Sequence, residues 1–258
     1  MEPIKTIFFD IDQTLIDGET NYIPQSASLA IQKAQKNGVR VFIASGRPFS
    51  NLSLDVLSIT NWDGYLCSNG ATFYNAEREL IHSISFKEKE RDALYSLCKK
   101  EKISLIYQTP STMFSVLSYG KDIENAFRFF HSPLPPQKPY EDEEVNMATV
   151  YQKSSFDFSV IDQIPGLFAI KGKADYADVI MDSVTKGSSL TLARKLFSLN
   201  GSVMAVGDGD NDLEMIESAD IGIAMGNATE RVKKKATYVT EDLYHDGLYK
   251  ALKHYSLI

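Results

Sequence analysis

The sequence predicts an α/β fold: a doubly wound parallel sheet interrupted by a large inserted α+β segment. Short apolar strands alternate with amphipathic helices near both ends of the chain, which is typical of parallel sheets. Between these regions the order of the expected elements changes: strands follow one another with fewer helices between them. Several apolar runs also end abruptly in acidic or small polar residues, at the strand ends where the ligand crevice of such sheets lies.

The first strand is expected over residues 4–9, an apolar run that stops at Asp10. Asp12 follows two residues later, and Thr14 two residues beyond that. A short apolar run closed by turn chemistry is typical of a buried parallel strand. Two carboxylates this close repel each other unless a cation or a shared proton relieves them. Taken alone, this pattern fits an ordinary acidic turn as well as a functional site.

The rest of the first core segment continues the β-α-β-α-β order that predicts right-handed crossovers. Gly38 supplies a helix stop, and Pro48 suits the first turn of the next helix. Asn69-Gly70 is interpreted as an ordinary turn after the third strand. The elements expected after the first strand are a flap or hairpin, a helix, a strand, a second helix and a third strand, over residues 15–24, 27–37, 39–44, 48–59 and 65–68.

The middle of the chain is expected to form a separate α+β domain. The proline-rich residues 132–136 predict an exposed loop within it. We therefore place the core in residues 1–81 and 183–258 and the inserted domain in residues 82–182. Its expected helices cover residues 86–100 and 122–131, and its expected strands cover residues 104–108, 113–118, 145–151, 167–170 and 177–181.

The doubly wound pattern returns at Lys186, which opens a helix. The strand after this helix ends at Gly207–Asp212, a turn dense in acidic and amide side chains. The elements expected from there to the C-terminus are a helix from residue 213, a strand over 221–224, a basic helix over 230–235 and a terminal helix to about residue 255.

Composition restricts the class of protein. The chain has 258 residues, a formal net charge of -7 and two cysteines. The negative charge disfavours a nucleic-acid or anionic-membrane partner, and so few cysteines suggest a reducing compartment. The N-terminus has no signal-peptide pattern, and no apolar run approaches the ~20 residues of a membrane span. We expect a soluble, cytoplasmic protein, as a monomer or small homo-oligomer.

Six polar residues follow strands or open helices, so that a doubly wound sheet can bring them to one crevice. They are Asp10, Asp12, Ser45, Lys186, Asp208 and Asp212. Carboxylate clusters without histidine or cysteine suit a hard cation, and sites that also hold phosphate usually use Mg²⁺. A lysine beside such a cluster is best explained by an anionic substrate, and a serine hydroxyl can donate to a phosphate oxygen. Together these residues point to phosphoryl transfer.

Each member of the set has an ordinary alternative. Ser45-Gly46 could be a strand-ending turn, and Lys186 a solvated surface residue. Gly207–Asp212 could be a calcium loop, but counting from Asp208 the twelfth position is Ala219, where an EF-hand needs glutamate. Their joint occurrence in this order is what favours a single site.

The sequence resembles the Cof-type branch of the haloacid dehalogenase (HAD) superfamily of phosphohydrolases. The matching pieces, in chain order, are Phe9–Leu15, Ala44–Arg47, Thr185–Gly187, Gly207–Asp212, Ile223–Ala228 and Asp246-Gly247. The resemblance implies a Rossmann-like HAD core with a large α+β cap domain inserted between the second and third motifs. It implies a Mg²⁺-dependent phosphatase that acts on a small phosphorylated metabolite, with sugar phosphates as the favoured class.

The resemblance also implies roles for individual residues. Asp10 would be the nucleophile that forms an aspartyl-phosphate, and Asp12 would be the general acid and base. Mg²⁺ would be held by the Asp10 carboxylate, the main-chain carbonyl of Asp12 and Asp208, with Asp212 in support. The phosphate and substrate would be held by Ile11, Ser45, Gly46, Arg47, Lys186 and Asn211.

Gln13 is the one departure from the family pattern, because most relatives carry glycine there. A positive φ at this position would strain glutamine by ~1 kcal/mol or more. We expect altered flap geometry more than lost activity. Two other functions stay open: a phosphomutase of the same superfamily, and a catalytically silent metabolite-binding module.

Overall fold

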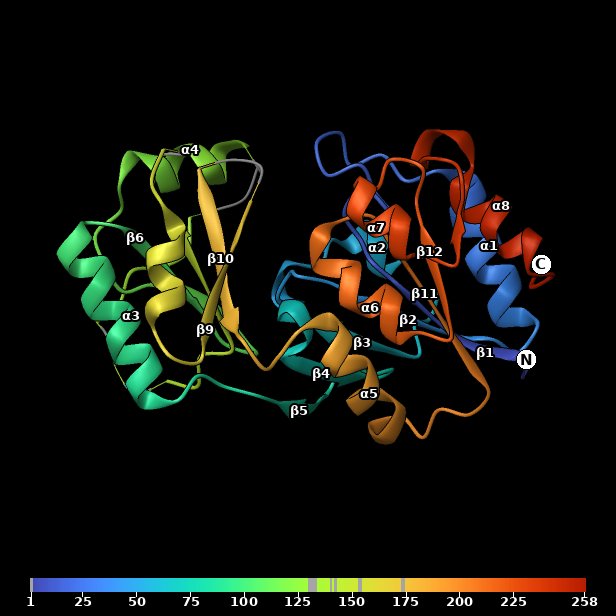
Figure 1. The fold of residues 1–258 in the computed structure, drawn as a ribbon, viewed down its shortest axis with the longest axis horizontal. Coiled ribbons are helices and arrows are strands. Elements are labelled where there is room, and N and C mark those ends of the chain that lie inside the picture. The colour runs from blue at the N-terminus through green and yellow to red at the C-terminus, as the bar shows by residue number, and fades with distance from the viewer. Residues whose placement is uncertain (1, 130–133, 140, 142, 153–154, 173–174) are drawn as a thin grey trace. The chain divides into compact units, whose positions relative to one another are not determined.

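The computed structural model describes residues 2–129, 134–139, 141, 143–152, 155–172 and 175–258. The chain divides into two compact units, which are shown in Figure 1. The core unit comprises Met1–His82 and Val184–Ile258, and the inserted unit comprises Ser83–Ser183. The sequence between the two parts of the core unit therefore forms a body of its own.

An eight-stranded sheet organises the core unit, in the order β13-β12-β11-β1-β2-β3-β4-β5. Its six strands from β13 to β3 are parallel, and β4 is antiparallel to β3. The strands are β1 (Ile4–Phe9), β2 (Arg40–Ala44), β3 (Gly64–Cys67), β4 (Thr72–Asn75), β5 (Leu80–Ser83), β11 (Ser202–Gly207), β12 (Ile221–Ala224) and β13 (Tyr238–Val239). β1 lies near the middle, so the turn after it is placed at the centre of the sheet's carboxyl edge.

Helices cover both faces of this sheet, which explains why its central strands are apolar without alternation. Ile7 and Phe9 belong to one core layer together with residues of α1 and α8. Phe8 belongs to the opposite layer, where its ring stacks on Phe42 at 4.9 Å and where α5 and α6 pack. The helices are α1 (Gln25–Lys36), α2 (Leu54–Leu57), α5 (Lys186–Leu196), α6 (Leu213–Ser218), α7 (Glu230–Lys235) and α8 (Gly247–His254).

The core unit differs from the sequence prediction in several short elements. The helix expected over residues 48–59 is a 3₁₀ turn followed by the four-residue α2, because Leu52 is extended and the Ser53 side chain caps a new helix. The expected flap over residues 15–24 contains no hairpin strands: one isolated bridge joins Asp12 to Ile16. Strands β4, β5 and β13, which are two to four residues long, were not predicted.

The inserted unit has a five-stranded sheet in the order β7-β6-β8-β10-β9, and every neighbouring pair is antiparallel. The helices expected there are observed as α3 (Glu88–Glu101) and α4 (Lys121–Phe129). The end of the second expected helix and residues 132–133 of the proline-rich loop lie outside the described residues. The strands are β6 (Ser104–Gln108), β7 (Met113–Ser115), β8 (Met147–Tyr151), β9 (Leu167–Lys171) and β10 (Tyr176–Met181).

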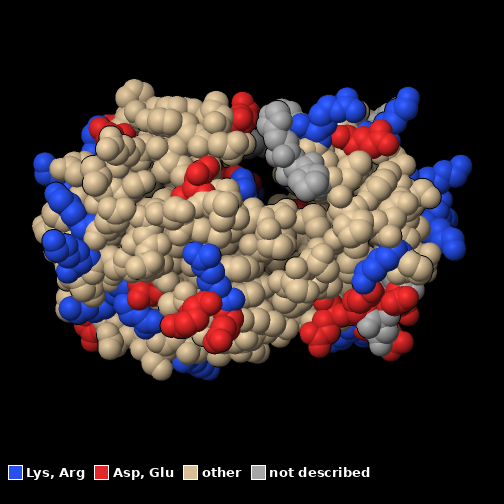
Figure 2. Space-filling view, turned by 180° about the vertical axis from the view of Figure 1, so that it is seen from behind, with Lys and Arg blue, Asp and Glu red and all other residues tan. Residues whose placement is uncertain are grey.

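Charged side chains of both signs are spread in small groups over the face shown in Figure 2, with uncharged surface between them. Such mixing is the usual state of a protein surface. Among the described residues, no helix combines the length and the apolar composition needed to cross a membrane.

A row of polar side chains crosses the inserted sheet and makes the stability of that unit depend on pH. Gln108 Nε2 donates to Thr149 Oγ1 at 2.9 Å, and Thr149 Oγ1 donates to Asp178 Oδ1 at 2.9 Å. Burial raises the pKa of Asp178 to about 6, against the lowering effect of the Thr149 hydrogen bond. The folded chain therefore holds this proton more tightly than the unfolded chain does.

We expect Asp178→Asn to remove this pH dependence. Between pH 4 and pH 6 the folded parent binds more protons than the unfolded chain, so its free energy of unfolding falls as pH rises and levels off above about pH 7. The asparagine side chain is neutral at every pH. The free energy of unfolding of the variant should therefore equal that of the parent near pH 4.5 and exceed it near pH 7.5 by on the order of 2 kcal/mol. Urea unfolding at the two pH values measures the difference, and a difference that is equal at both would contradict the assignment.

Candidate active site

Three buried carboxylates meet at the carboxyl ends of β1 and β11. Asp10 follows β1 directly, and its N–H donates to the Val206 carbonyl at 2.9 Å, which extends the pairing of the two strands. Asp208 follows β11, and Asp212 closes the short 3₁₀ turn after it. One carboxylate oxygen from each of Asp10, Asp208 and Asp212 lies within 4.8 Å of the other two. We call these three residues the carboxylate cluster.

The loop after β11 is built around the Asp212 side chain, which is fully buried. Asp212 Oδ2 accepts hydrogen bonds from the N–H groups of Asp208 and Gly209, both at 3.0 Å. A Cβ atom on Gly207 would lie 2.6 Å from this carboxylate, so the loop can close only over glycine. The acidic loop thus holds Asp208 in a fixed position at the end of its strand.

Lys186 lies within the cluster and is 1% exposed, which excludes the surface interpretation of this residue. Its Nζ donates to Asp10 Oδ1 and to Asp212 Oδ1, each at 2.5 Å. Lys186 is the first residue of α5, and Thr185 and Ser188 form a reciprocal capping box around that helix start. The capped helix aims the lysine at the strand ends.

The electrostatics of this group favour a bound cation. Burial raises the pKa of Asp10 well above its usual range, and Asp212 raises it further, against the lowering effect of Lys186. Burial alone would lower the pKa of Lys186, but the Asp10 and Asp212 carboxylates outweigh it and raise that pKa. The site thus holds three carboxylates and one ammonium group. A bound cation would reduce the repulsion that the excess negative charge causes. The donors are all oxygen atoms, which fits a hard cation such as Mg²⁺.

The Asp12 carboxylate is held by Arg47 through two hydrogen bonds. Arg47 Nε donates to Asp12 Oδ2 at 2.9 Å and Nη2 donates to Oδ1 at 2.5 Å, a bidentate ion pair. The side chains are 44% exposed for Asp12 and 29% exposed for Arg47. Asp10 and Asp12, although two residues apart, therefore have different partners and different exposure.

Ser45 and Gly46 lie at the end of β2, beside the turn that follows β3. The Ser45 hydroxyl accepts a hydrogen bond from the Arg47 N–H at 3.1 Å, which leaves its own proton for another acceptor. Asn211 Nδ2 donates to Asn69 Oδ1 at 3.3 Å, and the Asn69 carboxamide lies against Gly46. The sequence pattern alone predicts only a turn at Asn69. Its place after a strand at the carboxyl edge was the available signal.

Gln13 adopts the positive φ that the sequence analysis considered, at 63°. Its N–H donates to the Ile16 carbonyl at 2.7 Å, and its carbonyl accepts from Asn227 Nδ2 at 2.8 Å. Gln13 Nε2 donates to Asp17 Oδ1 at 3.2 Å, and Asp17 also accepts a hydrogen bond from the Tyr244 hydroxyl. The strained backbone is thus held by partners in the flap and in the C-terminal part of the chain.

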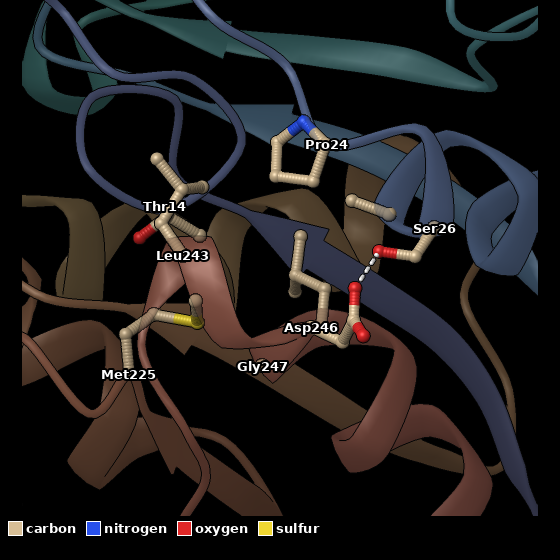
Figure 3. A pocket seen from close by; sticks show the side chains of 9 residues that line it. Thr14, Pro24, Ser26, Met225, Leu243, Asp246 and Gly247 are labelled. Carbon is tan, nitrogen blue, oxygen red and sulfur yellow. Dashed lines mark hydrogen bonds between the residues drawn. The ribbon is translucent and has the colours of Figure 1, made fainter.

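A crevice beside Thr14 shows how the flap meets the C-terminal helix (Figure 3). Pro24 and Ser26 line it from the end of the flap and the start of α1, and Leu243 and Asp246 line it from the segment before α8. Ser26 Oγ donates to Asp246 Oδ1 at 2.6 Å across it. The crevice has no room for a water molecule. We therefore interpret it as a gap between packed side chains and not as a ligand site.

The family model for haloacid dehalogenase-like hydrolases matches residues 7–252, almost the whole chain. The chain belongs to this family. The match spans both parts of the core unit together with the inserted unit. It confirms the family resemblance, and with it an enzyme of the hydrolase class.

Solved structures of HAD phosphatases share the fold over the whole chain. BT4131, described as a subclass IIB sugar phosphatase, is 32% identical, with a TM-score of 0.88 over 98% of this chain and 100% of that one. The phosphatase BT1666 from Bacteroides thetaiotaomicron is 29% identical, with a TM-score of 0.88 over 99% and 96% of the two chains. These likenesses confirm the predicted fold class.

A curated relative from Bacillus subtilis (strain 168) carries a more specific name. It is the 5-amino-6-(5-phospho-D-ribitylamino)uracil phosphatase YcsE, 25% identical over 255 residues that cover 98% of this chain and 96% of the relative. The similarity extends over nearly the full length of both proteins.

Proposed function

We propose that this chain is a Mg²⁺-dependent phosphatase that removes phosphate from a small phosphorylated metabolite through an aspartyl-phosphate on Asp10. The observation that carries the proposal is the buried carboxylate cluster with the Lys186 ammonium group inside it. A cluster of this kind brings a nucleophile, a cation site and a fixed positive charge from three separate segments of the chain into contact. Those are the parts that phosphoryl transfer requires.

Mg²⁺ would be held by the Asp10 and Asp208 carboxylates and the main-chain carbonyl of Asp12, with Asp212 in support. When bound, it would neutralise charge between the anionic nucleophile and the anionic phosphate. The chemistry of the donors supports this assignment, because the cluster offers only oxygen atoms and carries excess negative charge.

Asp10 would attack phosphorus through the carboxylate oxygen that Lys186 does not hold. Lys186 binds Oδ1, which leaves Oδ2 for the new bond. As the Oδ2–P bond forms, the bond from phosphorus to the ester oxygen breaks, and the Asp12 carboxyl group gives its proton to the departing alcohol. In the structure Asp12 is paired with Arg47, so proton transfer requires this ion pair to open.

The second half of the reaction would reuse the same two residues. The Asp12 carboxylate takes a proton from water as the water oxygen attacks phosphorus, and the Asp10–phosphorus bond breaks. Ser45, Gly46, Lys186, Asn211 and the N–H of Ile11 would hold the non-bridging oxygens through both halves, where charge stabilisation supplies most of the catalysis.

The relatives favour polyol phosphates as the substrate class. BT4131 is described as a sugar phosphatase, and the YcsE substrate carries its phosphate on a ribityl chain. We further propose that the inserted unit selects the substrate and limits the access of water to the aspartyl-phosphate, as mobile domains over active sites do. Its substrate-selecting residues would lie in the segment from Ser83 to Ser183.

Release of inorganic phosphate from a panel of sugar and polyol phosphates tests the proposal. We expect release with Mg²⁺, without any bisphosphate activator, and its loss when a chelator removes the metal. Isomerisation of a sugar phosphate without phosphate release would indicate a phosphomutase instead. No release and no isomerisation with any member of the panel would contradict the proposed function and favour a binding module.

A further inference from the structure

The turn between β3 and β4 contains three consecutive residues with positive φ. Ser68, Asn69 and Gly70 have φ values of 52°, 54° and 96°, and all three are buried. Left-handed backbone is unfavourable for most residues other than glycine, asparagine and aspartate, so Ser68 carries most of the strain. Among the described residues outside this turn, positive φ occurs only at isolated positions. A buried run of this kind persists only where the surroundings determine it, and such strain is concentrated at functional sites.

Two neighbours fix the turn against the phosphate-binding side of the candidate site. The Asn69 N–H donates to the Ser45 carbonyl at 3.0 Å, and the Ser68 N–H donates to the Arg47 carbonyl at 2.9 Å. On the other side Ser189 Oγ donates to the Gly70 carbonyl at 2.8 Å. The turn is therefore bound both to the motif after β2 and to the first turns of α5.

Gly70 shows how tightly the turn is packed against α5. A Cβ atom at Gly70 would lie 2.2 Å from Ser189 Oγ and 2.9 Å from the Thr185 carbonyl oxygen. Glycine is required there both for its φ and for this close approach. Asn69, by contrast, is not required for the backbone conformation, because glycine would adopt it without strain.

The Asn69 side chain connects two groups that are expected to hold phosphate. Its Oδ1 accepts the hydrogen bond from Asn211 Nδ2 at 3.3 Å. The same oxygen and the amide nitrogen lie 3.1 and 3.3 Å from the place where a Cβ of Gly46 would stand. Asn69 is 3% exposed, so this arrangement is shielded from solvent.

We infer that Asn69 is a positioning residue of the phosphate site. The left-handed turn directs its carboxamide between Gly46 and Asn211, where it orients the Asn211 amide and supports the backbone at Gly46. The inference rests on the proposed function, since it concerns the groups that would hold the transferred phosphate. Asparagine is common at positive φ in ordinary turns, so the inference depends on the contacts of the Asn69 carboxamide and not on the occurrence of asparagine in the turn.

Asn69→Gly separates this role from a purely structural one. Glycine keeps the backbone conformation and removes the side chain, so relief of the positive φ offsets part of the lost contacts and the thermal midpoint should fall only slightly. We expect kcat/KM for p-nitrophenyl phosphate to fall about tenfold, the effect of one misplaced hydrogen-bonding group. Ser198→Gly is the matched control: it relieves a φ of 49° at an exposed position after α5 and should leave activity unchanged.

The same substitution in an Asn211→Ala background provides the decisive comparison. If Asn69 acts through Asn211, Asn69→Gly should change kcat/KM much less in that background than in the parent. A tenfold loss in both backgrounds, or full activity of the single variant, would overturn the inference. Should Asn69→Gly not fold, Asn69→Ser shortens the side chain away from Asn211, and serine adopts positive φ elsewhere in this chain, so the same comparison applies.

Failure of the proposed function can be distinguished from failure of the inference. If the parent releases no phosphate from any ester, calorimetric binding of inorganic phosphate in the presence of Mg²⁺ replaces turnover. Parent binding that Asn69→Gly weakens about tenfold would support the inference alone. Equal binding by both proteins, or no binding by the parent, would overturn it.

Discussion

Asp10→Asn should abolish phosphatase activity almost completely, with a loss of at least ~10³-fold in kcat for any substrate that the parent hydrolyses. The amide cannot form the covalent bond to phosphorus, although it has nearly the same shape as the carboxylate. Because Asp10 lies in a buried group of like charges, its replacement by a neutral side chain should not lower stability. The thermal midpoint should stay the same or rise.

The measurement is inorganic phosphate release by the two proteins at saturating Mg²⁺, together with their unfolding curves. Asp210→Asn is the matched control, because Asp210 is an exposed aspartate of the same acidic loop that pairs with Arg231. The control should retain nearly full activity. Undiminished phosphate release by the Asp10 variant would rule out Asp10 as the nucleophile.

Lys186→Met should have the second largest effect, on both activity and stability. Methionine has a similar length but no charge, so Asp10 and Asp212 lose the ammonium group that each contacts at 2.5 Å. Removing one partner from a buried ion pair costs about 3–5 kcal/mol in the free energy of unfolding. We expect kcat/KM to fall ~10²-fold or more, because a fixed charge at the phosphate is lost.

Added Mg²⁺ distinguishes the loss of charge balance in the carboxylate cluster from general damage to the core. If unpaired carboxylates destabilise the variant, added Mg²⁺ should raise its thermal midpoint more than that of the parent. Lys195→Met, at an exposed position of the same helix, should change neither stability nor activity. A Lys186 variant that is as stable as the parent without Mg²⁺ would contradict the charge balance described for the cluster.

Much of the fold could be predicted because the strands of the core carry strong local signals. The run before Asp10 and the run before Asp208 are apolar, short and closed by turn chemistry, which marks buried parallel strands. The missed elements, β4, β5 and β13, have at most four residues, too few to establish a period. The helix over residues 48–59 was wrong because the cap at Ser53 starts a new helix that periodicity alone does not reveal.

The candidate site was predictable where the chain itself fixes the chemistry. Lys186 and Asp208 follow strand or helix boundaries, so topology brings them to the same edge as Asp10. The pairing of Asp12 with Arg47 depends on long side chains that meet in space, and no spacing in the sequence shows it. The role inferred for Asn69 depends on a left-handed backbone, which a sequence containing Asn-Gly allows but does not require.

Mass spectrometry of the Asp12→Asn variant tests the central claim most directly. This variant keeps the nucleophile but lacks the group that protonates the departing alcohol and later activates water. With Mg²⁺ and p-nitrophenyl phosphate, whose leaving group departs without a proton, an aspartyl-phosphate should therefore form and accumulate. The peptide that contains Asp10 should then gain the mass of one phosphoryl group, and the same peptide from an Asp10→Asn, Asp12→Asn double variant should not. Phosphate release by the parent with no modified Asp10 peptide in the Asp12 variant, or with the phosphoryl group on another residue, would contradict the proposed mechanism.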